Sequence, residues 1–437
     1  MSSAPPSLFD LAKPAALSDP YPVLAGLREA SPFAAREGLL YVTGRHHEIS
    51  AVLRDPRVSS ERRNSLLAAS SARPAAPIRS FLTLDPPDHT RLRGLVSRAF
   101  TARTIARLEP RIRSLADELL TGAGRAGEGG GAPGGGVAGA GAAGGAGRAG
   151  AAGKAREIDV VEQLAYPLPV RIISELLGVP VDDRPRFAGW SARLAHSLQP
   201  RLGGITQESA EEIEELKTAR AEFAAYFREL IARRRREPGD DLLSELIQAE
   251  DEGSRLTEGE LIATCILLLV AGHETTVSLI SNGILALLRH PDQLAALRAD
   301  PGLASGAVEE TLRYDAPVQF TSRVVRGGLQ VGRVSVPDGG MVLLLLAAAG
   351  RDPAVYDDPD RFDIRRGPSG HLAFAAGPHF CLGAPLARLE GAIALEAFAT
   401  RVRAPELAEG GLEYRPNLNL RGPQRLLVRH AGTLAGG

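Results

Sequence analysis

Cysteine is nearly absent from the sequence, and this scarcity excludes several kinds of protein. Cys265 and Cys381 are the two cysteines among 437 residues. Two thiols cannot form a disulfide scaffold, and they are too few for a cysteine-rich zinc or iron–sulfur site. The sequence therefore predicts a reducing, cytoplasmic location.

Net charge and long hydrophobic runs are also lacking. The 51 Lys and Arg residues balance 52 Asp and Glu, so no bulk field would attract nucleic acid or an anionic membrane. Residues 1–20 lack the basic flank and apolar stretch of a secretory signal. The longest apolar run, 261–272, ends at His273 and Glu274, well short of the roughly 20 residues that span lipid. We expect neither a nucleic-acid partner nor a membrane segment.

The chain does contain enough apolar residues, 44% of the total, to build a large core. We expect one domain over residues 1–437. The segment 122–154 is almost entirely Gly and Ala and can bury almost nothing. Because helical patterns resume on both sides of it, we interpret it as a disordered insertion within that domain, with an interdomain linker as the alternative.

Hydrophobic periodicity predicts a mainly α (α+β) fold with small β-sheets. One helical stripe lies within residues 92–100, and 211–236 reads as a long charged helix. The longest predicted helix begins at Thr257, which can form a capping box with Glu260, and it continues until Pro291. At 1.5 Å per residue it would be about 50 Å long. Strand signals are short and occur at 40–43, around Val324, at 331–336 and at 342–346.

The most informative stretch runs from Phe374 to Gly383, where Cys381 lies in a glycine-bounded turn before a helical pattern. Unpaired N–H groups and the positive end of a helix dipole would lower the pKa of the thiol. Glycines let the backbone approach a flat cofactor closely. A thiolate held in this way could bind haem iron.

Two other interpretations of Cys381 stay open at this point. It could be a buried, inert cysteine, as we expect Cys265 to be. It could also bind zinc together with His371 and His379, although no fourth ligand is evident.

The segment from Phe374 to Gly383, followed by Ala384 to Glu390, resembles the cysteine-loop signature of bacterial cytochromes P-450. The resemblance covers nearly the whole chain and implies a single triangular, mainly helical domain that holds haem b, with Cys381 as the iron ligand. It also places Phe374 and Gly383 against the haem. The chain departs from the family pattern at Ala375, where Gly is usual, and at Gly350, where Asn is usual.

Glu310 and Arg313 share a helical face and could be an ordinary surface ion pair. The resemblance instead identifies them as the Glu-x-x-Arg pair of the family. It assigns the completing arginine to Arg361, in Pro359-Asp360-Arg361-Phe362. We expect these three residues to act in folding and haem retention.

The long helix carries Ala271-Gly272-His273-Glu274-Thr275 near its middle. A threonine there can simply bond back to the carbonyl four residues earlier, and a glutamate can face solvent. The resemblance indicates the oxygen-activating motif, in which Ala271 leaves room beside the haem. Glu274 and Thr275 would then supply the protons needed to cleave the O–O bond.

Haem propionates need cations, and His89 and Arg93 lie at i and i+4 on one predicted helix. Taken alone they would be a solvated basic face. The resemblance places both of them on the propionates, together with Arg323 and His379.

The resemblance implies a monooxygenase that inserts one oxygen atom of O2 into an apolar small molecule, by hydroxylation or epoxidation, plausibly in secondary metabolism. Electrons would come through a ferredoxin or flavodoxin and its NAD(P)H-dependent reductase, because no second cysteine cluster is present to carry them. We expect a monomer. Substrate contacts would come from 66–84, 188–204, 267–271, 318–321 and 418–420. The rival hypotheses are a peroxide-driven peroxygenase on the same fold and a non-catalytic haem sensor.

Overall fold

The computed structural model describes residues 7–69, 80–126, 156–183, 186, 190, 194, 210–251, 254–367 and 369–434. Most of the elements in these ranges are helices. The longer helices are α2 (Tyr21–Ala30), α3 (His46–Arg54), α5 (Asp88–Ala99), α6 (Ala102–Ala126), α7 (Pro167–Leu176), α9 (Ala210–Arg236), α11 (Glu258–Arg289), α12 (Pro291–Ala299), α13 (Ala304–Tyr314) and α15 (Ala384–Arg401). The shorter ones are α1 (Pro14–Ser18), α4 (Leu66–Ala69), α10 (Leu242–Gln248) and α14 (Leu346–Ala349).

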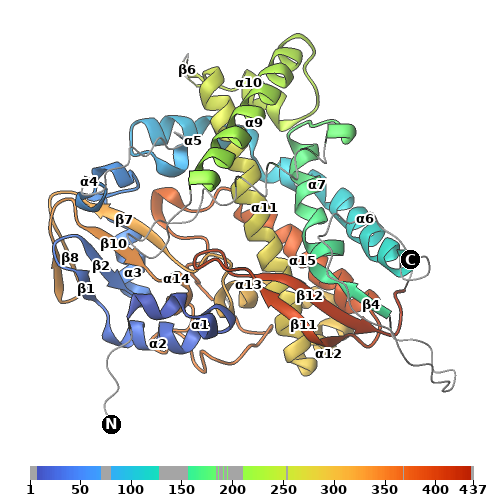
Figure 1. Ribbon diagram of the computed structural model, residues 1–437. Helices are drawn as coiled ribbons and strands as arrows, with labels where there is room; N and C mark the ends of the chain where they lie inside the picture. Colours follow the sequence, from blue (N-terminus) through green and yellow to red (C-terminus); the bar gives the residue numbers. More distant parts are fainter. Residues whose placement is uncertain are drawn as a thin grey trace.

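Helix α11 passes through the middle of the molecule (Figure 1). Its start is set locally by the predicted capping box, because the Thr257 hydroxyl accepts from the Glu260 N–H and the Glu260 carboxylate accepts from the Thr257 N–H. By length and composition α11 could cross a membrane, but 78% of its most apolar window is buried inside the protein. It is the central core helix that the sequence predicts.

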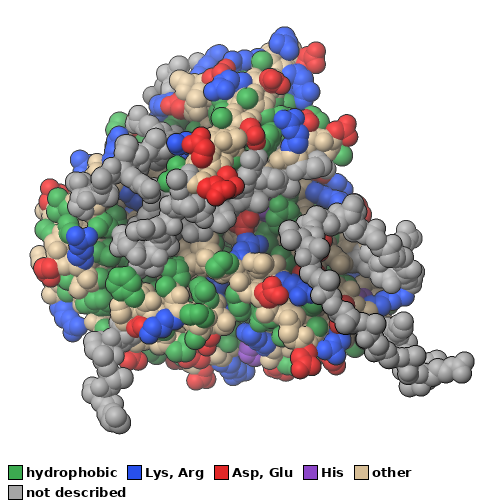
Figure 2. All heavy atoms as spheres, in the orientation of Figure 1, with side chains coloured by type: hydrophobic (Ala, Val, Ile, Leu, Met, Phe, Trp, Pro, Cys, Tyr) green, Lys and Arg blue, Asp and Glu red, His purple; other side chains and the backbone are tan. Residues whose placement is uncertain are grey.

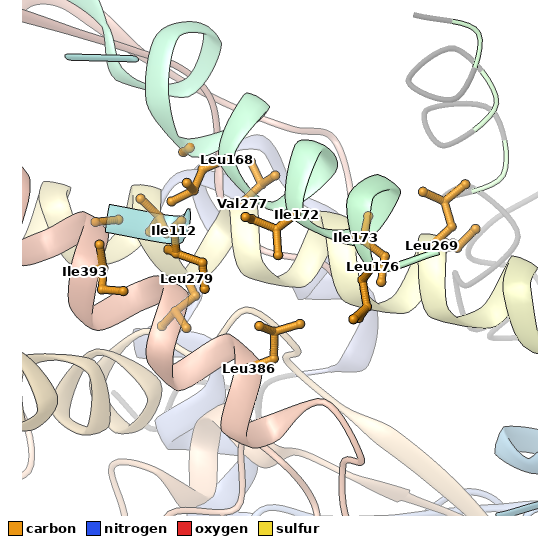
Figure 3. Close-up of a cluster of buried hydrophobic side chains, with 14 of the residues drawn as sticks. Ile112, Leu168, Ile172, Ile173, Leu176, Leu269, Val277, Leu279, Leu386 and Ile393 are labelled. Carbon is orange, nitrogen blue, oxygen red and sulfur yellow. The ribbon is translucent and has the colours of Figure 1, made fainter. Parts of the chain in front are cut away.

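The main hydrophobic core forms where α6, α7 and α15 pack around α11. Figure 3 shows side chains from the four helices pointing toward one another. Ile172, Leu269, Leu279 and Ile393 are buried here, each with at most 2% of its surface exposed. Burial of each such side chain contributes about 1.5–3 kcal/mol. This packing fixes α11 against α15, the two helices that carry the candidate site.

The largest sheet has five strands in the order β1-β2-β10-β7-β3. Strand β10 pairs in parallel with β2, and the other pairings are antiparallel. The strands are β1 (Phe33–Arg36), β2 (Leu40–Thr43), β3 (Val58–Ser59), β7 (Thr321–Val325) and β10 (Met341–Leu344). The predicted strands at 40–43, around Val324 and at 342–346 are therefore confirmed. The predicted strand at 331–336 is a hairpin of β8 (Leu329–Val331) and β9 (Val334–Val336).

A second sheet has the order β11-β12-β4, with β4 (Arg156–Asp159), β11 (Glu406–Tyr414) and β12 (Pro423–His430). A small hairpin joins β5 (Glu250–Asp251) to β6 (Ser254–Arg255). The long β11–β12 pair was not predicted from the sequence. Gly410 and Gly411 interrupt the alternation of β11, and the register shifts between Leu407 and Leu412.

The Gly/Ala-rich segment is shorter than predicted at its N-terminal end. Helix α6 continues through Ala126, so residues 122–126 are helical because they extend an established helix whose propagation favours alanine. The rest of the predicted insertion, 127–154, lies outside the described residues. On the face drawn in Figure 2, acidic and basic side chains are interspersed, in keeping with the formal net charge of −1.

Candidate functional site

The cysteine loop joins a 3-10 turn, Gly377–His379, to the start of α15 at Ala384. The Cys381 N–H donates to the Phe374 carbonyl at 3.0 Å, which closes the loop. A Cβ on Gly383 would lie 3.9 Å from the Cys381 sulfur, at ordinary van der Waals distance. Gly377 has a φ of 71°, and any side chain there would meet the Leu53 carbonyl oxygen at 2.2 Å.

The pKa of the Cys381 thiol differs from the expectation. Burial raises it, and this effect outweighs the lowering by the N–H groups of Gly383 and Ala384 and by the charges of Arg93 and Arg388. The prediction that the surroundings of Cys381 lower the pKa of its thiol is therefore wrong, because the net shift is upward. The N–H groups and guanidinium charges still stabilise a thiolate, and coordination to a metal ion deprotonates a thiol outright.

The two other interpretations of Cys381 gain no support. In the described part of the chain no group of three His, Cys, Asp or Glu side chains could hold a metal ion, so His371, His379 and Cys381 do not form a zinc site. The His371 Nε2 instead lies 3.3 Å from the Glu309 carboxylate. Cys265 is fully buried, and burial raises the pKa of its thiol, as expected for an inert core residue.

Four cationic or potentially cationic side chains converge beside the cysteine loop. The rings of His89 and His379 lie 4.1 Å apart between centroids. Arg93 donates to the Phe380 carbonyl at 2.7 Å. Burial and the charges of Arg323, His89 and Arg93 lower the pKa of His379 to about 3. The structure thus brings all four predicted propionate partners together.

Within the described part of the chain, Asp85 is the carboxylate whose charge acts on His89 and Arg323. Both ring nitrogens of His89 are buried and have no hydrogen-bond partner within the described structure. Arg323 is 7% exposed, and its Nη1 donates to the Thr321 hydroxyl at 3.3 Å and to the Ser322 carbonyl at 2.8 Å, neither of which is charged. The nearby Asp85 carboxylate is bound by Ser59 and by the Ser60 N–H at 2.8 Å. Buried donors without partners cost about 1–3 kcal/mol each, so the site fits a ligand that carries carboxylates, as haem does.

The acid and hydroxyl groups of α11 lie in the middle of that helix. The Thr275 hydroxyl donates to the Ala271 carbonyl at 2.7 Å, and Thr276 donates to Gly272 at the same distance. Glu274 is 7% exposed, so it does not face solvent. Its carboxylate forms an ion pair with Arg415, a residue for which no sequence motif predicts a role.

Glu310 and Arg313 are a buried pair and not a surface one. The Arg313 Nε and Nη2 donate to the two oxygens of Glu310 at 2.7 and 2.8 Å. The other donors reach the carbonyls of Gly350, Pro359 and Arg361 at 2.7–2.9 Å. All five N–H groups of the guanidinium therefore have an acceptor.

The prediction that the Arg361 side chain completes this pair is wrong. The Arg361 guanidinium is 63% exposed and lies 3.7 Å from Asp363. Arg366 occupies the expected place, with its Nε 3.3 Å from Glu310 Oε1. Arg361 contributes its carbonyl, because the chain turns there and directs its side chain to solvent.

Gly350 is required by close packing. A Cβ at this position would lie 2.3 Å from the Arg313 carbonyl oxygen. At this position, where Asn is usual in the family, the chain therefore has a glycine that packs directly against the backbone of Arg313.

Comparisons with known proteins agree with this geometry. Residues 197–301 and 302–401 match the family model described as "Cytochrome P450". The cytochrome P450 monooxygenase PikC of Streptomyces venezuelae is 43% identical over 94% of this chain and 91% of that protein. The vitamin D(3) 25-hydroxylase of Pseudonocardia autotrophica is 40% identical over 94% of this chain and 93% of its own length.

The fold also matches solved structures. The ligand-free crystal structure of Mycobacterium smegmatis CYP164A2 superimposes with a TM-score of 0.83 at 46% identity, covering 96% of this chain and 98% of that one. The members of this family are haem-iron oxygenases. The chain belongs to the cytochrome P450 family.

Proposed function

We propose that this cytochrome P450 monooxygenase hydroxylates or epoxidises an apolar small molecule, with Cys381 as the iron ligand and Glu274 and Thr275 as the proton-delivering pair. The observation that carries the proposal is the pairing of two packed helices. Helix α15 begins at the loop that holds Cys381, and α11, which packs against α15, carries the buried acid beside a threonine.

Haem b, when bound, supplies the activation of O2 and the insertion of oxygen. The chain's own residues would hold it. His89, Arg93, Arg323 and His379 present donors to its two carboxylates, and charge-assisted bonds of this kind fix orientation. Phe374, Ala271 and Gly383 would lie against the ring.

Thr275 and Glu274 would manage protons. Because the Thr275 hydroxyl donates to the Ala271 carbonyl, its oxygen lone pairs remain available to accept a hydrogen bond from water. Glu274, the next residue, has a carboxyl group that can take a proton from water and release it again. Such positioned proton transfer contributes on the order of 10²–10⁴-fold to a rate.

Electrons would reach the site from a ferredoxin or flavodoxin and its NAD(P)H-dependent reductase, and we expect the enzyme to be a cytoplasmic monomer. Substrate would contact the apolar side of 267–271 and the segments 318–321 and 418–420. Val318 and Leu420 form an isolated β-bridge, which brings the last two segments together. Most of the remaining predicted contact residues, 70–79 and 188–204, lie outside the described residues apart from 190 and 194.

The test is the Thr275→Ala variant with Thr276→Ala as its matched control. Both threonines bond back to α11 in the same way, so both changes should affect the helix similarly. With O2, a surrogate ferredoxin and its reductase, we expect Thr275→Ala to form at least about tenfold less product per NADH, and Thr276→Ala to resemble the wild type. Undiminished coupling in Thr275→Ala would favour a peroxide-driven peroxygenase. NADH consumption that never yields oxidised product from any ligand would favour a haem sensor.

A further inference from the structure

Glu274 does not point into open space. The carboxylate contacts the Nη1 group of Arg415, and the two side chains are 9% and 20% exposed. Arg415 follows directly after β11, and 141 positions separate it from Glu274. The β11–β12 hairpin lies against α11 (Figure 1).

The hairpin docks on the face of α11 that carries Glu274. A Cβ on Gly422 would lie 2.5 Å from the Ser278 hydroxyl, and the Asn282 side-chain amide donates to the Arg421 carbonyl at 3.1 Å. Positions 274, 278 and 282 are four residues apart and share one helical face. The approach of the hairpin therefore depends on a glycine directly opposite Ser278.

The segment that carries Arg415 is held at both ends. The Arg415 N–H donates to the Gly422 carbonyl at 3.4 Å. Arg421 donates to the Asp315 carboxylate at 2.8 Å and to the Leu17 carbonyl at 2.8 Å. Arg415 is thus presented to Glu274 by a fixed turn, and little side-chain ordering is needed when the pair forms.

The neighbouring side chains of His273 and Tyr166 do not supply a positive charge to Glu274. The His273 Nδ1 lies 3.9 Å from the carboxylate, but burial and the charge of Arg415 lower the pKa of His273 to about 3, so its ring is neutral. Tyr166 packs edge-on against His273 at 4.6 Å between centroids, and burial raises the pKa of its hydroxyl. Arg415 is the cation that faces the acid.

A small cavity borders the hairpin side of this pair. It measures about 20 Å³ and is lined in part by Gln319, Tyr414, Arg415, Asn417 and Arg421. This volume admits about one water molecule, and the polar lining offers it partners. A water there would adjoin Arg415.

We propose that Arg415 is a positioning residue for oxygen activation, which keeps Glu274 ionised and turned toward the hairpin, where it recovers its proton from solvent. In this cycle the Glu274 carboxylate accepts a proton from water and becomes a neutral carboxylic acid, which separates from Arg415. Glu274 then passes the proton toward the site beside Thr275. The ionised carboxylate then returns to Arg415. The proposal rests on the proposed role of Glu274 as proton donor.

The first test reads the charge of Glu274 without turnover. Infrared spectra of wild type and Arg415→Met, each corrected by its own Glu274→Gln spectrum, should differ at neutral pH. We expect an ionised carboxylate in the wild type and the carbonyl stretch of a protonated acid in Arg415→Met, because a buried carboxylate without its cation is neutralised. Arg415→Lys should keep the ionised form, since the contact needs a single charged donor. A carboxylate that stays ionised in Arg415→Met would overturn the proposal.

The second test separates positioning from substrate binding. We expect Arg415→Met to form on the order of tenfold less product per NADH, with unchanged substrate affinity in the spin-state titration, and Arg415→Lys to restore the yield. Arg425→Met is the matched control, because Arg425 lies on the same hairpin in an exposed pair with Glu413 at 3.5 Å. Lost affinity with normal coupling would contradict the proposal. Normal coupling in Glu274→Gln would instead refute the proton-donor role of Glu274, whatever the infrared result.

Discussion

The Arg313 guanidinium lies fully buried against the Glu310 carboxylate, and the Nε of Arg366 lies 3.3 Å from Oε1 of the same carboxylate. Arg361, five residues earlier, turns its side chain to solvent. The buried charge of Glu310 is therefore balanced by two guanidinium groups, and neither of them is Arg361.

This arrangement predicts different costs for two neighbouring arginines. Arg366→Leu should lower the free energy of unfolding by about 1.5–3 kcal/mol, because it removes charge-assisted bonds to Glu310 and to the Asp357 carbonyl. Arg361→Leu should change it by no more than about 0.5 kcal/mol, as expected for an exposed residue. Denaturant unfolding of both variants measures the difference. A larger loss in Arg361→Leu than in Arg366→Leu would contradict the assignment.

The cysteine loop contains an alanine in an unfavourable conformation. Ala375 has a φ of 58°, and the left-handed region costs a non-glycine residue about 1–2 kcal/mol. Ala375→Gly should therefore raise the free energy of unfolding by about 1 kcal/mol. Its neighbour Ala376, at φ −154°, is the control: Ala376→Gly should destabilise, since glycine there only adds unfolded-state entropy and loses a buried methyl group. Equal effects of the two changes would show that backbone conformation at 375 does not matter.

The propionate cluster predicts a selective loss of haem. Arg323→Met removes a buried guanidinium that would bind a propionate, and a hydrogen bond to a charged group contributes about 1.5–3 kcal/mol. Transfer of haem to apomyoglobin should accelerate on the order of tenfold or more. Arg326→Met, at an arginine that is 64% exposed and 3.9 Å from Asp85, should transfer haem at the wild-type rate. If haem transfers from Arg323→Met at the wild-type rate, Arg323 does not bind a propionate.

A buried acid on α15 predicts how stability depends on pH. Glu390 is 2% exposed, and burial raises its pKa to about 8. The folded protein then keeps a proton that the unfolded chain loses near its ordinary value of about 4.3. Stability should fall as pH rises from about 4.3 to about 8, by up to about 1.4 kcal/mol per pH unit from this group.

Glu390→Gln should flatten that decline and increase stability at neutral pH. Glu396→Gln, on the same helix, is the control, because the Glu396 carboxylate is paired with Arg113 at 2.9 Å. Thermal unfolding of the three proteins between pH 5 and pH 8 measures the slopes. A Glu390→Gln slope equal to that of the wild type would show that Glu390 is ionised in the folded protein.

Local chemistry explains which parts of the fold could be predicted from the sequence. The start of α11 was predictable because Thr257 and Glu260 cap it within one turn. Strand β2 was predictable from a short run of β-favouring residues. Strand β11 was not, because its glycines and register shift remove the alternation, and its pairing with β12 depends on contacts that no local pattern encodes.

The candidate site divides in the same way. Cys381 was predictable because the loop and its glycines are contiguous in sequence. The convergence of His89, Arg93, Arg323 and His379 could be anticipated only through the family resemblance. The Glu274–Arg415 pair had no sequence signal, since the two residues meet only after the hairpin has docked on α11.

The most direct test of the whole account is the carbon monoxide difference spectrum of the reduced, purified protein. If Cys381 binds the iron as a thiolate, the Soret band of the wild type should lie far to the red of that of an imidazole-ligated haem, and Cys381→Ser should lose this feature while Cys265→Ser retains it. A Cys381→Ser spectrum identical to that of the wild type, or protein recovered without haem from haem-replete cells, would contradict the account.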